Sequence, residues 1–158
     1  MTEFAQTQSP FTWVSSGSGQ VPPNAIQGGI EKTGLPLYIA RTTFKNGVHP
    51  GKCGSHLSNG GFSMGWGGRE LNMGSYEVLC GDVSRLKWVR VSGKLHDNPG
   101  VRLVKAGSEE DGTPLFVSKV LHHGSQHLGK AGFHLNGTNF GYGGREVVES
   151  EYYVLAYA

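Results

Sequence analysis

Pro36-Leu37-Tyr38-Ile39-Ala40-Arg41 occurs twice in this chain, because it returns 78 positions later as Pro114-Leu115-Phe116-Val117-Ser118-Lys119. Residues 49–57, His-Pro-Gly-Lys-Cys-Gly-Ser-His-Leu, return at the same displacement as His-Leu-Gly-Lys-Ala-Gly-Phe-His-Leu in residues 127–135. Self-similarity at a fixed displacement indicates a repeat architecture and has to be recognised before individual elements are placed. We therefore expect two similar halves.

The repeat continues downstream with a small change of spacing. Gly65-Trp66-Gly67-Gly68-Arg69-Glu70 returns as Gly141-Tyr142-Gly143-Gly144-Arg145-Glu146, and residues 76–79 return as residues 152–155. Both of these displacements are 76, so the second copy has lost two residues in an intervening loop. Nearly the whole chain is therefore covered by the two copies.

The length of the chain favours one body over two. Each copy has fewer than eighty residues, and a unit of that size buries too little apolar surface to be secure alone. We therefore expect a single compact body whose halves share a core. Its predicted parts are a disordered tail at 1–10, a first repeat at 11–80, a connector at 81–86 and a second repeat at 87–158.

The chain consists of many short segments rich in aromatic and β-branched residues, which strands favour. Glycine, at 26 residues, is about twice its average usage of about 7%, which indicates many tight turns. Apolar spacing of three and four residues nowhere persists long enough to indicate a helix. We predict an all-β fold in which two pseudo-symmetric tandem repeats form one compact, β-sandwich-like body.

Strand positions follow from the turn signals. Asn46-Gly47 is a strong hairpin signal, and it closes a predicted strand at 37–44. We place the following strand at 52–57. In the second copy we place strands at 101–106 and 129–135, among others at positions equivalent to those of the first copy.

Two pairs of residues are assigned to the interior. Trp13 and Trp88 occupy equivalent positions in the two copies, and we expect both to anchor the core. Cys53 and Cys80 are the only cysteines, and a disulfide framework or thiolate metal site needs more sulfur or a clear spacing. We expect two reduced, mostly buried thiols.

Charge and hydropathy exclude several classes of partner. The chain has 14 basic and 12 acidic side chains and a net charge of +2, without the basic stripe expected of a nucleic-acid-binding protein. No stretch approaches the 18 apolar residues of a membrane span, so no membrane insertion is expected. The first ten residues do not read as a secretory signal. We predict a cytoplasmic protein, or one released by an unconventional route.

Histidines raise the question of a metal site, since imidazole suits zinc, copper or nickel. His122, His123, His127 and His134 form the candidate group, but only the last two have histidine counterparts in the first copy. We expect hydrogen-bonded histidines on and beside strands, with no metal and no other cofactor. The chain also lacks a nucleophile elbow, a phosphate loop and a zinc-protease motif.

Glu70 and Glu146 each follow Gly-Gly-Arg and suggest the paired carboxylates of a glycosidase. Duplicated residues lie at equivalent places in two halves, however, so their separation need not suit that mechanism. The interpretation we favour is that each carboxylate forms an ion pair or hydrogen bond within its own half, with Arg41 and Lys119 as possible partners.

Duplicated acid and lysine residues at turns are the remaining candidates. Glu31 with Lys52, and Glu109 with Lys130, combine hydrogen-bond acceptors with donors. Such a pair can hold two neighbouring hydroxyls of a sugar, and its charges strengthen both hydrogen bonds. The alternative is a solvated surface pair, which contributes less than about 1 kcal/mol to stability.

The motifs together resemble the DM-nine (DM9) repeat family. They are Trp-Val-x-x-Ser-Gly, Pro-x-Asn-Ala-Ile-x-x-Gly, Leu-Tyr-Ile-Ala-Arg, Pro-Gly-Lys-Cys-Gly-x-His-Leu, Gly-Gly-Arg-Glu and Tyr-Glu-Val-Leu, in that order between Trp13 and Leu79. Within the family the chain is most similar to tandem-repeat mannose-binding lectins of bivalve type. The second copy is looser, since it lacks the Pro-x-Asn-Ala-Ile segment and has Lys119 in place of the arginine.

The resemblance implies an all-β body of two halves, often paired as a homodimer, with one mannose site per repeat and neither metal nor catalysis. It implies that Glu31 and Lys52 hold the sugar, and the internal repeat extends this to Glu109 and Lys130. The family lectin has aspartate where this chain has Glu31. In the second copy, Glu110 or Asp111 are alternatives to Glu109 as the acid.

Three functional hypotheses follow. The first is a metal-independent lectin that binds mannose or mannose-containing glycans without catalysis. The second is an intracellular protein-interaction or stress-response module that reuses the fold without binding sugar, since fold alone does not fix function. The third is a hydrolase that uses Glu70 or Glu146.

Overall fold

The computed structural model describes residues 10–96 and 99–158, so most of the tail predicted at 1–10 lies outside the described residues. The first repeat forms β1 (Phe11–Gly17), β2 (Gln27–Ile30), β3 (Pro36–Phe44), β4 (Gly47–Cys53), β5 (Phe62–Trp66), β6 (Arg69–Met73) and β7 (Ser75–Gly81). A single 3-10 turn, η2 (Val83–Arg85), precedes the second repeat. That repeat forms β8 (Leu86–Ser92), β9 (Lys105–Ser108), β10 (Pro114–His122), β11 (Ser125–Ala131), β12 (Thr138–Tyr142), β13 (Arg145–Glu149) and β14 (Glu151–Tyr157).

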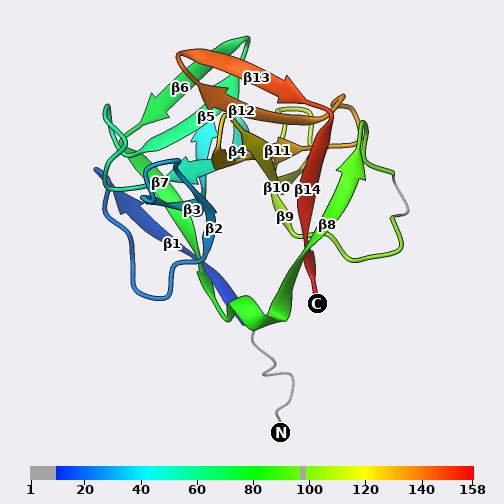
Figure 1. The fold of residues 1–158 in the computed structure, drawn as a ribbon, viewed down its shortest axis with the longest axis horizontal. Helices are drawn as coiled ribbons and strands as arrows, with labels where there is room; N and C mark the ends of the chain where they lie inside the picture. Colours follow the sequence, from blue (N-terminus) through cyan, green and yellow to red (C-terminus); the bar gives the residue numbers. More distant parts are fainter. Residues whose placement is uncertain (1–9, 97–98) are drawn as a thin grey trace, which may run out of the picture.

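The predicted all-β class is confirmed, and the described residues contain no α-helix. They therefore also contain no helix long and apolar enough to cross a membrane. The strands form one sheet that closes on itself, because β3 and β4 pair directly and are also joined the other way round through β2, β11, β12, β13, β6 and β5. The remaining strands flank this ring on either side (Figure 1).

Strands of the two repeats pair with one another at three places. The pairs are β2 with β11, β4 with β9, and β6 with β13. In Figure 1 the first-repeat strands β1, β7, β3 and β2 lie on the left and β10, β14 and β8 on the right, with β4 and β11 between them. The halves are thus interlaced in one body.

The turn between β3 and β4 is a two-residue hairpin turn. Lys45 and Asn46 have positive φ angles of 48° and 65°, as both central residues of a type I′ turn must. The second repeat builds the same turn from His123 and Gly124, with φ angles of 50° and 79°. The predicted hairpin is confirmed, but the turn sits one residue earlier than Asn46-Gly47.

Two strands begin earlier than predicted. We expected strands at 52–57 and 129–135, whereas β4 begins at Gly47 and β11 at Ser125. The reason is the tight turn, which leads directly into a strand that pairs with its predecessor from its first residue. Lys52 and Lys130 therefore lie at the penultimate position of a strand.

The strand predicted at 101–106 is replaced by the short β9, which begins only at Lys105. Before it, Leu103 makes an isolated bridge to Ala156 on β14. Val104 is buried in the core. The segment is therefore extended and packed, but most of it forms no continuous ladder.

The central part of the core is shared by both repeats, as expected for halves too small to fold separately. Its buried residues come from both copies and are Ile26, Leu37, Ile39, Leu79, Val104, Ala106, Val117, Leu128 and Leu155. Two further clusters lie one within each repeat, around Phe62 and Phe140.

Trp13 and Trp88 do not occupy the centre of the core. They stand opposite Leu79 and Leu155 on paired strands, which confirms their equivalence, but both are only partly buried and cover the core from outside. The reason is that β1 and β8, which carry them, are the two edge strands of the sheet. Each indole also lies under a cationic side chain. Cys53 and Cys80 are free and buried, as predicted, and burial raises the pKa of the Cys53 thiol to about 12.

The two Gly-Gly-Arg-Glu turns join the repeats by reciprocal hydrogen bonds. Glu70 Oε1 accepts from Gly144 N at 2.9 Å, and Glu146 Oε1 accepts from Gly68 N at 3.0 Å. The backbone N–H groups of Glu70 and Glu146 donate to the carbonyls of the same glycines, each at 3.1 Å. The other oxygen of each carboxylate accepts a hydrogen bond within its own half, as predicted: Glu70 Oε2 from Ser63 Oγ at 2.5 Å, and Glu146 Oε2 from Asn139 Nδ2 at 3.2 Å. The prediction is therefore confirmed for Oε2, whereas the contacts of Oε1 cross to the other repeat and were not predicted.

Arg41 and Lys119, the suggested partners of those glutamates, lie elsewhere. Arg41 Nε donates to Glu77 Oε1 at 2.8 Å, and its guanidinium lies 4.1 Å from the Trp13 ring centroid. Lys119 Nζ lies 4.5 Å from the Trp88 ring centroid. Each cation covers the tryptophan of its own repeat.

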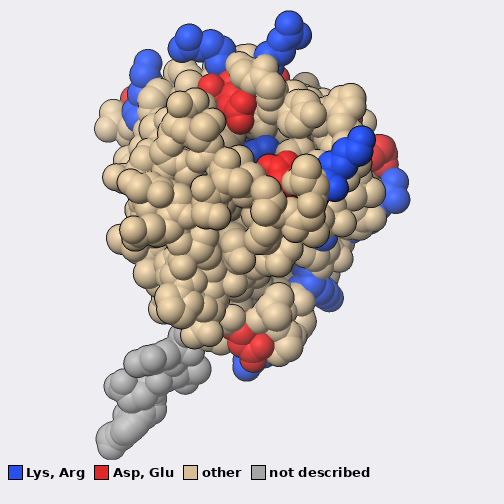
Figure 2. All heavy atoms as spheres, turned by 60° about the vertical axis from the view of Figure 1, so that its left-hand side comes forward, with Lys and Arg blue, Asp and Glu red and all other residues tan. Residues whose placement is uncertain are grey.

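Charged side chains are distributed over the surface without a broad patch of one sign on the face drawn in Figure 2. There, basic side chains project singly and acidic side chains lie between them. This agrees with the nearly balanced composition of 14 basic and 12 acidic residues.

Candidate functional site

The two predicted acids occupy equivalent turns. Glu31 follows β2, and its backbone N–H donates to Leu35 O at 2.8 Å. Glu109 follows β9, and its backbone N–H donates to Thr113 O at 2.8 Å. Glu109, rather than Glu110 or Asp111, is therefore the structural counterpart of Glu31.

Asp111 has a different role in the same turn. Its Oδ1 accepts from Thr113 N at 3.0 Å and from Thr113 Oγ1 at 2.8 Å, and these bonds hold the pKa of the carboxyl below its usual value. The side chain thus shapes the turn that presents Glu109.

Each acid is held by a histidine of its own repeat. His56 Nε2 lies 2.9 Å from Glu31 Oε2, and His134 Nε2 lies 2.7 Å from Glu109 Oε2. The glutamate side chains are 22% and 27% exposed, so a ligand can reach both. The second glycine of the Gly-Lys-x-Gly motif makes room, because a Cβ at Gly54 would lie 2.8 Å from the His56 ring.

The two predicted lysines are buried and cross to the other repeat. Lys52 Nζ lies 2.8 Å from His127 Nδ1 and donates to Gly141 O at 2.8 Å. Lys130 Nζ lies 3.1 Å from His49 Nδ1. Both lysines are only 3% exposed, so their main contacts are with the protein.

Electrostatics fix the protonation of these histidines. Burial and then the Lys52 charge lower the pKa of His127 to about 3, and burial and then the Lys130 charge lower the pKa of His49 to about 4. Both imidazoles are therefore neutral near pH 7. Because an ammonium can only donate, each Nδ1 is an acceptor and the proton lies on Nε2.

Acid and lysine of one repeat influence each other without direct contact. Among the ion pairs of the described residues, none joins Glu31 to Lys52 or Glu109 to Lys130. Burial lowers the pKa of Lys52 to about 8, and the charges of Glu70 and Glu31 oppose that shift. We predicted acid and lysine side by side in one half, whereas the structure inserts a histidine of the other half beside each lysine.

An open pocket of about 640 Å³ lies at Glu109. Three of its lining residues come from the second repeat and three from the first; they are Glu109, Glu110, Asp111, Lys45, His49 and Trp66. Lys45 Nζ lies 5.0 Å from the Trp66 ring centroid and so stands beside the indole at the rim. The pocket therefore combines carboxylates, a cation, an imidazole and an aromatic ring.

The sequence predicted only Glu109, with Glu110 and Asp111 as alternatives, among these lining residues. Lys45, His49 and Trp66 were missed because they belong to the other repeat. His49 and Trp66 both lie in repeated motifs, so the sequence did carry a signal for them, but not for their joining the opposite acid.

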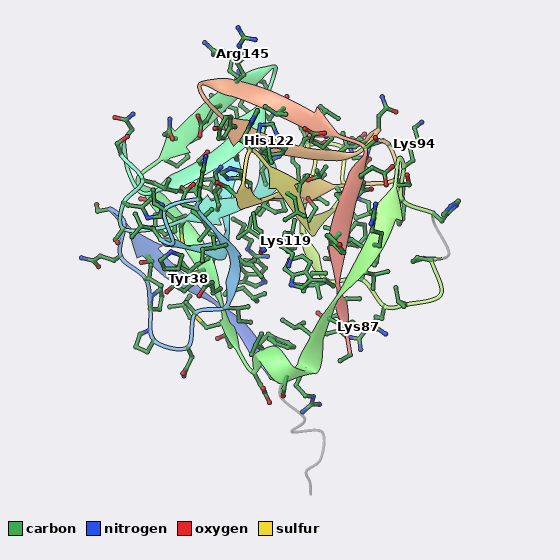
Figure 3. The ribbon with its side chains drawn as sticks, in the orientation of Figure 1. Tyr38, Lys87, Lys94, Lys119, His122 and Arg145 are labelled. Atoms are coloured by element: carbon green, nitrogen blue, oxygen red, sulfur yellow. The ribbon has the colours of Figure 1, made fainter. Side chains whose placement is uncertain are left out.

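The equivalent surroundings of Glu31 have a different rim. The turn bearing Glu31 contacts β11, since Lys32 N donates to Ser125 Oγ at 2.9 Å. His123 and Tyr142 are the counterparts of Lys45 and Trp66 in the repeat. Their rings stack with centroids 5.6 Å apart, and His122 meets the Tyr142 ring edge-on at 4.8 Å. Figure 3 shows His122 in the upper part of the view, below Arg145.

The histidines considered as metal ligands are engaged otherwise. His122 Nδ1 lies 3.1 Å from Glu149 Oε2, and His134 holds Glu109. Within residues 10–96 and 99–158, no group of three His, Cys, Asp or Glu side chains is placed to hold a metal ion.

Comparison with known proteins places the chain in a family. The sequence profile of the DM9 repeat matches residues 2–72 and residues 44–149, which together span most of the chain. This chain belongs to the DM9 repeat family. Membership suggests a module of carbohydrate-binding type.

A solved structure shows that the DM9 fold of this chain occurs elsewhere. The nematode sperm cell motility protein MFP2B superposes with a TM-score of 0.65 at 16% identity, over 92% of this chain and 46% of that one. The chain thus spans about half the length of that protein, and the likeness shows the fold alone. No curated protein sequence matches the chain significantly.

Proposed function

We propose that this DM9 protein is a metal-independent lectin that binds mannose-type glycans through two sites, one at Glu31 and one at Glu109. The observation that carries the proposal is the pocket at Glu109, where three carboxylates face an indole and an imidazole in a space of about 640 Å³. A hexose offers vicinal hydroxyls to the carboxylates and an apolar ring face to Trp66.

The buried Lys130 supplies indirect support at the Glu109 site. Lys130 holds His49 Nδ1 as an acceptor, so its Nε2–H is available as a donor in the pocket that His49 lines. A neutral donor beside ionised acceptors matches a neutral diol, because each hydroxyl both donates and accepts. The roles proposed for the residues are acceptor for Glu31 and Glu109, and positioning of the imidazole and of positive charge for Lys52 and Lys130.

Two sites in one chain favour multivalent glycans over free sugar. Linked sites gain about 10²- to 10⁴-fold in avidity without new contacts, provided that both engage together. A homodimer, as the family resemblance implies, would double the number of sites again. Mannan, which presents many mannose residues, is therefore the ligand on which the protein should be retained.

The test is retention on mannan-agarose together with a glycan array. Wild type should be retained in the presence of a metal chelator, and the double variant Glu31→Gln/Glu109→Gln should pass through. Glu151→Gln is the matched control, because Glu151 is an exposed glutamate paired with Arg90 on an outer strand. Equal retention of the double variant would remove these residues from the site, and a blank array for wild type would end the lectin proposal.

A further inference from the structure

Arg41 and Lys119 each cover a tryptophan, but within the described part of the chain only Arg41 is neutralised by an acidic side chain. Arg41 is paired with Glu77 at 2.8 Å, and its Nη1 also donates to Ala106 O at 3.0 Å. Lys119 stands opposite Tyr153, at the place where Arg41 stands opposite Glu77. Among the described residues, no carboxylate lies within ion-pair distance of Lys119 Nζ.

Lys119 lines a pocket formed by residues of both repeats. A pocket of about 240 Å³ lies between β2, β8, β10 and β11, and its lining residues are Gln27, Gly28, Gly29, Ile30, Trp88, Lys119 and Gln126. In the first repeat the guanidinium of Arg41 bridges from Trp13 to Ala106 O, the counterpart of Gly28. Figure 3 shows Lys119 in the middle of the molecule, directed into the region between the two halves.

The lining chemistry is that of an anion site with polar neighbours. It contains one cation and no acid, together with the primary amides of Gln27 and Gln126 and the indole of Trp88. Burial lowers the pKa of Lys119, and no acidic side chain opposes that shift. A bound carboxylate would supply the charge that Glu77 supplies in the first repeat.

We propose that this pocket binds a uronic acid residue, with the sugar carboxylate on Lys119 Nζ and its hydroxyls on Gln27 and Gln126. The volume of the pocket suits a single sugar ring, because pockets for larger, drug-sized ligands measure about 300–1,000 Å³. A charge-assisted hydrogen bond to the carboxylate selects this ligand over a neutral hexose. The lining of this pocket includes neither Glu31 nor Glu109, and the equivalent cation of the first repeat, Arg41, is already paired with Glu77.

The experiment is a titration of ¹⁵N-labelled protein with methyl glucuronoside, followed by two-dimensional NMR. The indole N–H of Trp88 and the backbone amides of Gly28 and Gly29 should shift and saturate. Methyl glucoside, which has a hydroxymethyl group in place of the carboxylate, should bind at least about tenfold more weakly. The absence of saturable shifts at these amides, or equal binding of the two sugars, would overturn the proposal.

Two variants make the test specific. Lys119→Met removes the charge, and Tyr153→Glu introduces the carboxylate that Glu77 provides in the other repeat, so both should weaken glucuronoside binding about tenfold or more. Lys87→Met is the matched control, since Lys87 is an exposed lysine next to Trp88 on the same strand, and it should bind like wild type. Dispersed spectra show that each variant is folded, and wild-type binding by both folded test variants would refute the site.

Discussion

The surroundings of Glu31 and Glu109 share a buried framework and differ at the rim. In both, a histidine of the same repeat holds the acid, and a buried lysine holds a histidine of the opposite repeat. At the rim of the Glu109 pocket lie Trp66 and Lys45, and the repeat puts Tyr142 and His123 at the corresponding positions of the second copy. The buried lysines and the histidines that they hold are thus the same in the two copies, whereas the side chains at the rim have diverged.

This comparison separates two kinds of residue in a duplicated protein. A buried lysine that reaches across the repeats is constrained by both, because its loss leaves polar groups unsatisfied. A rim side chain touches few neighbours, so its replacement changes ligand preference at little cost in stability. The two sites are therefore expected to differ in affinity while depending on the same scaffold.

The largest expected effect is the loss of unfolding free energy when one of the two buried lysines is replaced, and this loss should differ between Lys52 and Lys130. Lys52→Met leaves Gly141 O and His127 Nδ1 without their donor and should lower the free energy of unfolding by about 3 kcal/mol. Lys130→Met removes the single longer bond to His49 and should cost about 1–2 kcal/mol. Urea unfolding of both variants measures this, and a larger loss for Lys130→Met would contradict the ranking.

Replacing Trp13 or Trp88 by alanine should also lower stability, with a smaller difference between the two variants. Each is partly buried, so replacement by alanine should cost about 2–3 kcal/mol, below the about 3–5 kcal/mol of fully buried aromatics. Trp13→Ala should be the more harmful, because the indole supports the guanidinium that Glu77 and Ala106 O also hold. Thermal unfolding checks the order, and a loss below 1 kcal/mol for both would show that neither covers the core.

Acidification should weaken the fold through His49 and His127. Their pKa values are lowered to about 4 and about 3 in the folded protein, so between pH 6.5 and those values the unfolded chain binds more protons than the folded one. Stability should therefore fall as the pH falls, by about 2 kcal/mol per histidine at pH 5.

Urea unfolding at pH 7 and pH 5 measures this loss. His127→Gln, whose amide oxygen can still accept from Lys52, should show a shallower pH dependence than wild type. An unchanged dependence would mean that His127 is not held neutral by its surroundings.

The smallest expected effect is the loss of mannose affinity when an aromatic residue at the rim of either site is replaced. Trp66→Ala in a protein whose other site is removed by Glu31→Gln should bind mannose about tenfold more weakly, since the sugar loses its apolar platform. Tyr142→Ala in the complementary Glu109→Gln background should lose only a few-fold, because the smaller ring is already stacked on His123. Calorimetric titration with a mannose oligosaccharide distinguishes the two, and identical losses would argue that the rims are equivalent.

Much of the fold could be predicted because the repeat and the turns leave local signals. The displaced copies predicted a shared core, and the hairpin residues predicted β3 and β4. The exact start of β4 could not be predicted, since Lys45-Asn46 and Asn46-Gly47 are both acceptable turns and only the register of the paired strands selects the former.

The candidate site was harder to predict because it depends on contacts between repeats. Alignment of the copies placed Glu31 with Lys52 and Glu109 with Lys130, but it says nothing about which half a side chain faces. The packing of β4 against β11 brings His127 to Lys52 and His49 to Lys130. The same limitation explains why the sequence predicted only the hydrogen bonds that Glu70 and Glu146 make within their own halves, and not those that cross to the other repeat.

The reciprocal bonds between the Gly-Gly-Arg-Glu turns bear on how such a chain arose. Residue 70 contacts 144 as residue 146 contacts 68, which is the isologous pattern of a dimer with a twofold axis. A single-copy ancestor could have formed these reciprocal hydrogen bonds only with a second polypeptide. We therefore expect the two fragments produced by cleavage within 81–86 to remain associated, because the contacts between the repeats do not depend on the peptide that connects them.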